Sequence, residues 1–344
     1  MRIAFFSTKS YDKEYFDRVN SNGHHQFIYF EAALNSATAS LSKEHDAVCL
    51  FVNDKADRET VEQLSANKVK LIALRCAGFN NVDLEAASKK NIKVVRVPAY
   101  SPEAVAEHAV ALILTLNRKT HKAYNRIREG NFSLENLTGF NLHGKTVGVI
   151  GTGKIGQAFC RIMLGFGCKI LAYDKFPSSE MQQAGVSYQP LDEVFAQSDI
   201  ISLHCPLLPE THHLINEQAF SKMKKGVMLI NTSRGAVINT ADAIDALKNE
   251  KLGYFGIDVY EQEEKLFFRD LSEKIIADDM IARLIGFPNV LITSHQGFFT
   301  KEALEQIAAV TIKNINDFEQ DSPLENEISY QPEVQKSESH ITAN

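Results

Sequence analysis

One histidine, one arginine and three glutamates stand just after apolar runs of the sequence, and their types suit the reduction of a carbonyl group. His295 follows the run VLITS, Arg234 lies in the segment NTSRG, and Glu261, Glu263 and Glu264 follow the run YFGIDV. Hydride transfer to a carbonyl requires a proton for the oxygen, which an imidazole can supply because it titrates near neutral pH. A 2-oxo acid also requires a cation for its carboxylate, and a guanidinium binds carboxylates through two parallel hydrogen bonds. The spacing leaves open which glutamate contacts the imidazole, and each of these residues could instead be structural.

A glycine-rich segment predicts a dinucleotide site. Gly151, Gly153 and Gly156 form a GxGxxG pattern between the apolar run KTVGVI and the amphipathic run IGQAFCRIMLGFG. Such glycines allow a tight turn, close approach of a pyrophosphate and close helix packing, while the helix N-terminus supplies N–H groups. Asp174 lies 23 residues after Gly151, where a carboxylate accepts hydrogen bonds from a ribose. The negative charge favours NAD over NADP, although Lys175 beside it weakens this argument slightly.

Short apolar runs alternate with helix-length segments along the chain. The predicted strands span residues 2–7, 47–52, 69–75, 93–97, 146–150, 170–173, 200–204, 227–231, 254–259 and 290–293. The helix-length segments include residues 102–128, 156–166, 241–248 and 301–318. Most strands lack polar alternation, which is typical of parallel strands covered on both faces. The pattern predicts an α/β fold with two Rossmann-like domains, parallel sheets and an active site in the cleft between them.

The position of the glycine pattern predicts the domain boundary. Such a loop normally follows the first strand of its domain, yet about 100 residues of βα units precede Gly151. We therefore expect residues 1–100 and 300–330 to form a substrate-binding domain and residues 101–299 to form an NAD-binding domain. Residues 331–344 are polar and show no pattern, so a loose tail is expected there.

Composition excludes several classes of partner. The chain has 344 residues, a net charge of −6 and five cysteines. The charge and the lack of a basic stripe argue against nucleic acid and membrane as partners. An odd number of cysteines without a CxxC pair is typical of reduced thiols, and the start of the chain lacks a signal-peptide core, so we expect a cytoplasmic protein. No HExxH motif occurs, and no metal site is predicted.

Other histidines and one apolar helix carry weaker predictions. The histidine pairs at 24–25 and 212–213 lie in polar segments and are expected to be solvated. His108 is expected to be a packing or surface position on a helix. Residues 103–118 of that helix carry more apolar side chains than one core-facing stripe requires, so one face is a candidate subunit interface. Complete burial within one subunit is the alternative.

Seven longer motifs support a resemblance to a known family. They are RCAGFNNVD (75–83), VRVPAYSPEAVAEHA (95–109), GKTVGVIGTGKIG (144–156), SLHCPL (202–207), NTSRGAVI (231–238), GIDVYEQE (256–263) and SHQ (294–296). With these motifs the chain resembles the D-isomer-specific 2-hydroxyacid dehydrogenases, most closely their fermentative D-lactate dehydrogenase branch. The resemblance covers nearly everything up to about residue 327.

The resemblance implies a set of site residues and NAD as the cofactor. The family's catalytic triad falls on Arg234, Glu263 and His295, with His295 as the acid/base, Glu263 orienting it and Arg234 binding the substrate. Glu263 is selected because it lies five residues after Asp258 in the family's DVYExE motif. The nucleotide contacts fall on Lys154, Ile155, Asp174, Cys205, Pro206, Thr211, Thr232, Ser233, Arg234 and Asp258, beside the three glycines. The substrate contacts fall on Ala77, Gly78 and Tyr100, together with Arg234 and His295.

The same resemblance favours pyruvate and D-lactate as the substrate pair. Tyr100 and residues 298–299 would form a small, partly aromatic pocket, and KLFFRDLSEKIIADD after Glu263 resembles the lactate-type extension. No regulatory domain is expected after residue 330, and a homodimer or homotetramer is expected. Two alternatives remain open. One is a related dehydrogenase for glyoxylate, hydroxypyruvate or a larger 2-oxo acid, and the other is an NAD-sensing corepressor-like binding protein.

Overall fold

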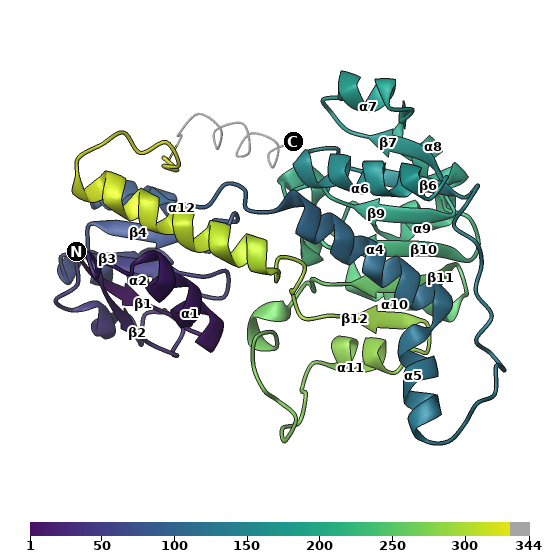
Figure 1. Ribbon diagram of the computed structural model, residues 1–344, viewed down its shortest axis with the longest axis horizontal. Coiled ribbons are helices and arrows are strands. Elements are labelled where there is room, and N and C mark those ends of the chain that lie inside the picture. The colour runs from purple at the N-terminus through teal and green to yellow at the C-terminus, as the bar shows by residue number, and fades with distance from the viewer. Residues whose placement is uncertain (331–344) are drawn as a thin grey trace, which may run out of the picture. The chain divides into compact units, whose positions relative to one another are not determined.

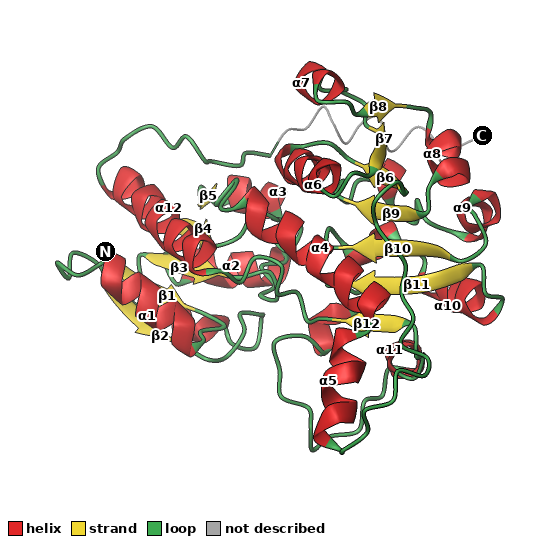
Figure 2. Ribbon diagram, turned by 45° about the vertical axis from the view of Figure 1, so that its right-hand side comes forward, coloured by secondary structure: helices red, strands yellow, loops and turns green. Residues whose placement is uncertain are grey.

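The computed structural model describes residues 1–330, so the loose tail predicted at 331–344 lies outside the described residues. The chain folds as two compact units (Figure 1). Among the described residues, one unit consists of Met1–Ser101 and residues 300–330, and the other of Pro102–Phe299. Each unit contains one sheet of parallel strands with helices packed against it (Figure 2). The predicted α/β fold with two parallel sheets is therefore confirmed.

The first unit has a sheet of five strands in the order β2-β1-β3-β4-β5. The strands are β1 (Arg2–Phe5), β2 (Gln26–Tyr29), β3 (Ala47–Leu50), β4 (Leu71–Leu74) and β5 (Lys93–Val95). The helices are α1 (Ser10–Val19), α2 (Arg58–Ala66), α3 (Leu84–Lys89) and α12 (Lys301–Glu319), with a 3₁₀ turn, η1, at Ala39–Ser42. Although α12 is the last helix of the described residues, it packs against α1 and β4 near the start of the chain.

The second unit has a sheet of seven strands in the order β12-β11-β10-β9-β6-β7-β8. The strands are β6 (Thr146–Ile150), β7 (Lys169–Tyr173), β8 (Ser187–Tyr188), β9 (Ile200–Leu203), β10 (Val227–Asn231), β11 (Leu252–Ile257) and β12 (Val290–Ile292). The helices are α4 (Pro102–Arg118), α5 (Thr120–Arg128), α6 (Lys154–Gly165), α7 (Ser179–Gln183), α8 (Leu191–Gln197), α9 (Glu217–Lys222), α10 (Thr240–Lys248) and α11 (Asp279–Ile285). Three 3₁₀ turns are η2 (Pro209–Thr211), η3 (Gly235–Val237) and η4 (Glu263–Lys265). The strand order reverses at β6, with β7 on one side and β9 on the other, which is the switch point where such sheets bind ligands.

Both faces of the larger sheet are covered, which explains the continuous apolar runs in the sequence. Along β10, Met228 and Ile230 belong to the core beneath α4 and α6, whereas Leu229 belongs to the core beneath α8 to α11. All three side chains are buried. Consecutive strand residues point to opposite faces, so a sheet with helices on both sides requires apolar residues at every position.

One local prediction is wrong, and two edge strands, β2 and β8, were not predicted. The continuous helix predicted for residues 102–128 is interrupted at Lys119, whose φ of 50° is left-handed. The first part, α4, is anchored by many buried residues, whereas α5 has none, so no packing extends the first helix. The edge strand β2 was not predicted because its residues are partly exposed and follow a polar segment.

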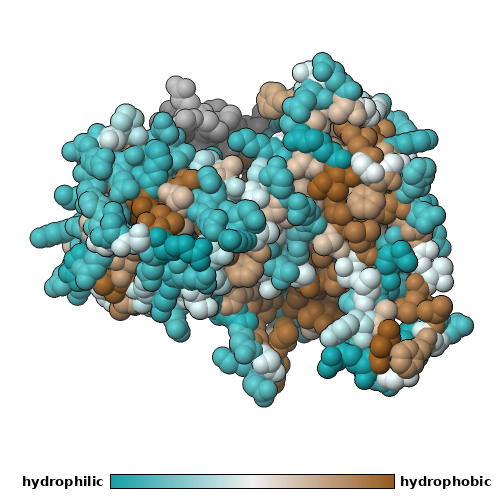
Figure 3. Space-filling view, in the orientation of Figure 1, coloured by the Kyte–Doolittle hydropathy of each residue, from teal (hydrophilic) through white to brown (hydrophobic). Residues whose placement is uncertain are grey.

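The apolar helix at 103–118 is packed within its own unit, so its composition gives no argument for a subunit interface. Its apolar residues belong mostly to the core that the helix shares with α6 and the sheet. This agrees with the alternative interpretation, in which the helix is buried within one subunit. Exposed apolar side chains lie instead on α5 and the segment after it, at Tyr124, Ile127, Phe132 and Leu134. Figure 3 shows apolar surface gathered around α5, at the lower right of the view.

Candidate active site

The polar residues singled out in the sequence of the second unit follow the carboxyl ends of its parallel strands. Asp174 follows β7, Cys205 follows β9, and Arg234 follows β10. Asp258 directly follows β11, and His295 follows β12. Because parallel strands end at the same edge of a sheet, these side chains share that edge.

His295 is hydrogen bonded to Glu263. The ring atom Nδ1 lies 2.8 Å from Glu263 Oε1, and the other carboxylate oxygen accepts a hydrogen bond from the backbone N–H of Tyr260 at 2.9 Å. Both side chains are largely buried, being 16% and 22% exposed. A carboxylate accepts but cannot donate, so Nδ1 carries the hydrogen and Nε2 remains for a substrate atom. This arrangement suits a general acid/base.

The other two glutamates do not contact His295. Glu261 lies 2.6 Å from His213 Nε2 and accepts hydrogen bonds from the backbone N–H and hydroxyl of Thr240. Glu264 is exposed. His213 is thus paired with a carboxylate and half-buried, so the prediction of a solvated ring is wrong at this position.

The backbone at His295 is strained, and Asp258 holds it in place. His295 has a φ of 54°, a left-handed conformation that costs a non-glycine residue about 1–3 kcal/mol. Its N–H donates to the carbonyl of Asp258 at 2.7 Å. The Asp258 carboxylate accepts from the next two backbone amides, those of Gln296 at 2.9 Å and Gly297 at 2.7 Å. These bonds fix the turn that carries the imidazole.

A half-buried histidine on α4 also supports this turn. His108 on α4 lies 3.0 Å from the Thr293 hydroxyl and 3.3 Å from Asp258 Oδ1, and the Thr293 hydroxyl donates to the same oxygen at 2.5 Å. Burial alone would raise the pKa of Asp258, but the hydrogen bonds from His108, Thr293 and Gln296 lower it overall. The sequence prediction of a packing or surface role for His108 missed this contact. The sequence feature that could have indicated this role is the place of His108 in the motif VRVPAYSPEAVAEHA, which is one of the motifs that carry the family resemblance.

Arg234 lies at the start of η3 and is half-buried. Its Nη1 donates to the carbonyl of Ser233 at 2.7 Å, the one acceptor found for this guanidinium within the described chain. The following Gly235 explains the placement, because a Cβ there would lie 2.1 Å from the carbonyl carbon of Tyr260. The loops after β10 and β11 therefore approach closely. Because Arg234 has one hydrogen-bond acceptor here, most of its guanidinium N–H groups remain available to an anion.

The glycine-rich loop has the shape that a dinucleotide requires. Gly151 has a φ of 92°, and a Cβ at Gly156 would lie 2.0 Å from the Gly151 carbonyl oxygen. A Cβ at Gly153 would meet nothing within 4 Å, and no side chain caps the N-terminus of α6, which begins with Lys154 and Ile155. The amides of that N-terminus are thus open to a pyrophosphate.

Three further observations support NAD in this site. The Asp174 carboxylate accepts from the backbone N–H of Thr152 at 2.5 Å, which fixes it next to the glycine-rich loop. Lys175 forms an ion pair with Glu210, so its charge is neutralised rather than available to a 2′-phosphate. The hydroxyl of Thr232 is buried with no hydrogen-bond partner, which indicates a place for a ligand atom.

Nearby segments are held rigidly. The Thr211 hydroxyl donates to the carbonyl of Pro206 at 2.6 Å and accepts from the N–H of Leu208, which closes the loop after β9. Cys205 lies beneath Gly151, whose Cβ would approach the Cys205 nitrogen to 2.7 Å. The N–H and hydroxyl of Ser233 both donate to Asn231 Oδ1. Sequence reasoning missed Asn231, which fixes the turn that carries Arg234.

The three predicted substrate residues outside this sheet belong to the first unit. Ala77 and Gly78 follow β4 and are half-buried, and neither N–H donates to an acceptor among residues 1–330. Tyr100 is half-buried near the end of the segment Met1–Ser101. Arg75, directly before this loop, is buried and donates to Asp12 and to the carbonyl of Ser7. These bonds anchor the end of β4.

Comparison with known proteins identifies the family. The family model of the D-isomer specific 2-hydroxyacid dehydrogenase, NAD binding domain, matches residues 110–297. D-lactate dehydrogenase of Escherichia coli strain K12 is 53% identical over 328 residues, which are 95% of this chain and 100% of that protein. The chain belongs to the D-isomer specific 2-hydroxyacid dehydrogenases. This dehydrogenase is therefore an NAD-dependent oxidoreductase that acts on CH–OH groups, and the predicted family, enzyme class and cofactor are confirmed.

Solved structures agree with the fold. The apo structure of E. coli D-lactate dehydrogenase gives a TM-score of 0.88 at 51% identity and covers 95% of this chain and 100% of its own. A D-lactate dehydrogenase from Lactobacillus jensenii, solved with NAD⁺, gives a TM-score of 0.80 at 30% identity and covers 96% of this chain and 100% of its own. None of the helices described for this dehydrogenase combines the length and apolar character that crossing a bilayer requires.

Proposed function

We propose that this dehydrogenase reduces pyruvate to (R)-lactate with NADH, and that it catalyses the reverse reaction as well. The observation that carries the proposal is the His295–Glu263 pair, with Nδ1 bonded to a fixed carboxylate and Nε2 left for the substrate. Relatives named D-lactate dehydrogenase, at 53% and 48% identity, support pyruvate as the oxo acid.

Separate residues bind the substrate carboxylate and transfer the proton. Arg234 binds the substrate carboxylate through its guanidinium, and the amides of Ala77 and Gly78 donate to the same group. Nε2 of His295 gives its proton to the ketone oxygen as the oxygen gains charge. The Glu263 carboxylate orients the ring and stabilises the imidazolium before the transfer. Tyr100 is the tyrosine that the family resemblance assigns to the substrate.

The cofactor residues follow from the shape of the loop and its surroundings. Gly151, Gly153 and the N-terminus of α6 would hold the pyrophosphate, Asp174 the ribose, and Thr232 a polar atom of the nicotinamide end. NADH, when bound, supplies the hydride, so that pyruvate, NADH and one proton become (R)-lactate and NAD⁺. In the reverse direction neutral His295 accepts the proton of the lactate hydroxyl.

Initial rates with a panel of 2-oxo acids test this assignment. We expect the highest kcat/KM with pyruvate, compared with glyoxylate, hydroxypyruvate and a branched 2-oxo acid, and (R)-lactate as the product in chiral analysis. A higher kcat/KM with another oxo acid would assign this enzyme to a different activity of its family. Absence of turnover with all four would overturn the proposed reaction.

We also propose how the chain is organised for this reaction. Residues 1–100 and 300–330 act as the substrate-binding domain, and residues 101–299 act as the NAD-binding domain.

A homodimer or homotetramer is supported by the exposed apolar side chains around α5, including Phe132 and Leu134, which are 74% and 81% exposed. Sedimentation equilibrium at micromolar concentration tests the assembly, and a mass of one chain would refute it.

A cytoplasmic location completes the proposal. All five cysteines of the chain are buried and none forms a disulfide, as expected for thiols kept in a reducing compartment. Fractionation of the source cells, with enzyme activity as the readout, tests the location.

A further inference from the structure

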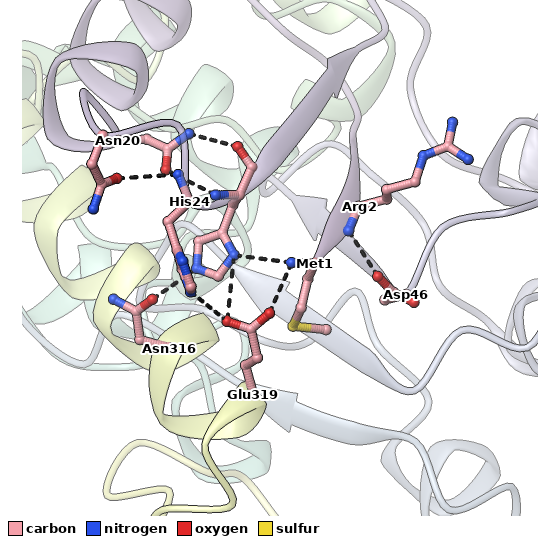
Figure 4. Close-up of polar contacts among 9 residues, drawn as sticks. Met1, Arg2, Asn20, His24, Asp46, Asn316 and Glu319 are labelled. Atoms are coloured by element: carbon pink, nitrogen blue, oxygen red, sulfur yellow. Dashed lines mark hydrogen bonds and ion pairs between the residues drawn. The ribbon is translucent and has the colours of Figure 1, made fainter.

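Two neighbouring histidines and a glutamate come together at one end of the first unit (Figure 4). His24 Nε2 lies 2.6 Å from Glu319 Oε2, and His25 Nδ1 lies 4.0 Å from the same oxygen. The three possible ligand atoms all lie within 4.8 Å of one another, in the only such group of His, Cys, Asp or Glu within residues 1–330. Imidazole nitrogens and a carboxylate are ligands that zinc and other divalent transition metals prefer.

His25 presents an unprotonated nitrogen to this group. Its side chain is 1% exposed, so the prediction of a solvated pair is wrong for this ring. Nε2 lies 2.8 Å from the amide oxygen of Asn316, which can only accept, and so Nε2 carries the hydrogen. The amino group of Met1 lies 3.4 Å from Nδ1 and can only donate, so Nδ1 carries a lone pair. A second ring N–H bound to an amide or carboxylate oxygen is the usual support of a metal-binding histidine.

The backbone around the histidines is also fixed. Asn20 donates to the carbonyl of His25 at 2.7 Å and accepts from its N–H at 3.1 Å. His25 directly precedes β2, and Glu319 is the last residue of α12. The candidate ligands therefore come from two elements almost 300 residues apart in sequence, both belonging to one unit.

Glu319 is ionised and already compensates positive charge. Its Oε1 accepts from the amino group of Met1 at 2.9 Å, and that amino group also lies 3.4 Å from His25 Nδ1. A bound cation would take over the part now played by the amino group of Met1.

We propose that His24 Nε2, His25 Nδ1 and the Glu319 carboxylate bind one divalent transition-metal ion, and that this ion is Zn²⁺. Zinc bonds to nitrogen and oxygen are about 2.0–2.2 Å long, so the ligand atoms need to move by about 1 Å or less around the ion. His24 is half-exposed and can make most of this movement. Its ring hydrogen, which now faces the Glu319 carboxylate from Nε2, must lie on Nδ1 when the ion is bound, so that Nε2 offers its lone pair. Water occupies the fourth position of the tetrahedron. The ion links the segment before β2 to the end of α12 and thereby stabilises the first unit.

Metal binding to the full, untagged chain tests the site. Calorimetric titration with Zn²⁺, and competition with a chromophoric zinc chelator, are expected to give one ion per chain, with a rise in Tm when zinc is present. His24→Gln changes a half-exposed side chain and should fold normally, yet weaken zinc binding at least tenfold and abolish the rise in Tm. Glu319→Gln should have the same effect on zinc binding. Asn316→Ala should weaken binding about tenfold, the range for the loss of a hydrogen bond that orients a ligand.

The second histidine pair of the chain provides a matched control. His212 and His213 are also adjacent and lie near a glutamate, but their rings stack at 3.9 Å, and only His213 contacts Glu261. His212→Gln should leave the zinc stoichiometry and affinity unchanged. Absence of stoichiometric zinc binding in the wild-type chain would overturn the proposal. Equal affinity of the wild type, His24→Gln and Glu319→Gln would do so as well.

Discussion

Replacement of Glu263 by glutamine must break one of two hydrogen bonds. The carboxylate now accepts from His295 Nδ1 at 2.8 Å with one oxygen and from the N–H of Tyr260 at 2.9 Å with the other. A glutamine amide has one accepting oxygen and one donating nitrogen. If its oxygen faces the imidazole, its NH₂ group opposes the N–H of Tyr260. If the amide is turned round, the NH₂ group faces Nδ1 and favours the tautomer with hydrogen on Nε2, without a charge to stabilise the imidazolium.

The size of the effect follows from the bond that is lost. A hydrogen bond to a charged group contributes about 1.5–3 kcal/mol. Since about 1.4 kcal/mol corresponds to a factor of ten, kcat/KM for the oxo acid should fall between about 10-fold and 150-fold. The dissociation constant of NADH should change little, because the structure gives Glu263 no contact with the glycine-rich loop.

Steady-state rates with saturating NADH and varied pyruvate, together with a fluorescence titration of NADH, measure both quantities. Glu261→Gln and Glu264→Gln are the matched controls, because Glu261 pairs with His213 and Glu264 is exposed. Both should keep kcat/KM within about twofold to threefold of the wild type. A Glu263→Gln enzyme with nearly full kcat/KM, or a Glu261→Gln enzyme with an equal loss, would refute the assignment of the His295 partner.

Three other substitutions test the substrate contact, the cofactor contact and the pH dependence of stability. Arg234→Lys keeps the charge but loses the planar fork, so kcat/KM for pyruvate should fall about 10-fold to 150-fold with NADH binding retained; unaltered kinetics would remove Arg234 from the substrate site. Asp174→Ala should weaken NADH binding and reduce the preference for NADH over NADPH in kcat/KM, and an unchanged preference would contradict its contact with the ribose. Burial lowers the pKa of His204 to about 3. The unfolded chain therefore takes up a proton below about pH 6.5 that the folded chain does not, and the fold loses about 2 kcal/mol between pH 8 and pH 5. Urea midpoints of His204→Gln should fall less than those of the wild type over this range, and equal losses would show that His204 is not the cause.

The sequence was sufficient for the architecture because strand and helix alternation depends on local composition. Apolar runs such as that around Leu229 predict strands covered on both faces, and the glycines of residues 151–156 predict the loop that follows β6. The interruption of the helix at Lys119 was not predictable. The apolar pattern shows which side chains of a helix can be buried, but it does not show where the structure that covers them ends. The edge strand β2 lacks the burial that makes other strands visible in sequence.

The candidate site was predictable in its residue types but not in its pairings. Three glutamates lie among residues 261–264 after β11, and their spacing leaves the partner of His295 open, so that Glu263 could be selected only through the family motif. The fold shows that Glu263 contacts His295, whereas Glu261 contacts His213. His108 lies about 150 residues before Asp258 in sequence, and helical periodicity marks only that one side of α4 is buried. The burial of His25 likewise depends on α12, which reaches the start of the chain only in the folded unit.

The deep burial of the thiols has a consequence for chemical robustness. Burial raises the pKa of Cys205 to about 11 and those of Cys49 and Cys160 to about 12. At pH 8 only about one molecule in a thousand carries the Cys205 thiolate, and about one in ten thousand each of the others, and the thiolate is the form that electrophiles and peroxides attack. The native enzyme should therefore survive oxidants and alkylating agents that modify exposed cysteines. Labelling of these thiols by such a reagent would then measure unfolding. Labelling of Cys49 would measure unfolding of the first unit, and labelling of Cys160 and Cys205 would measure unfolding of the second.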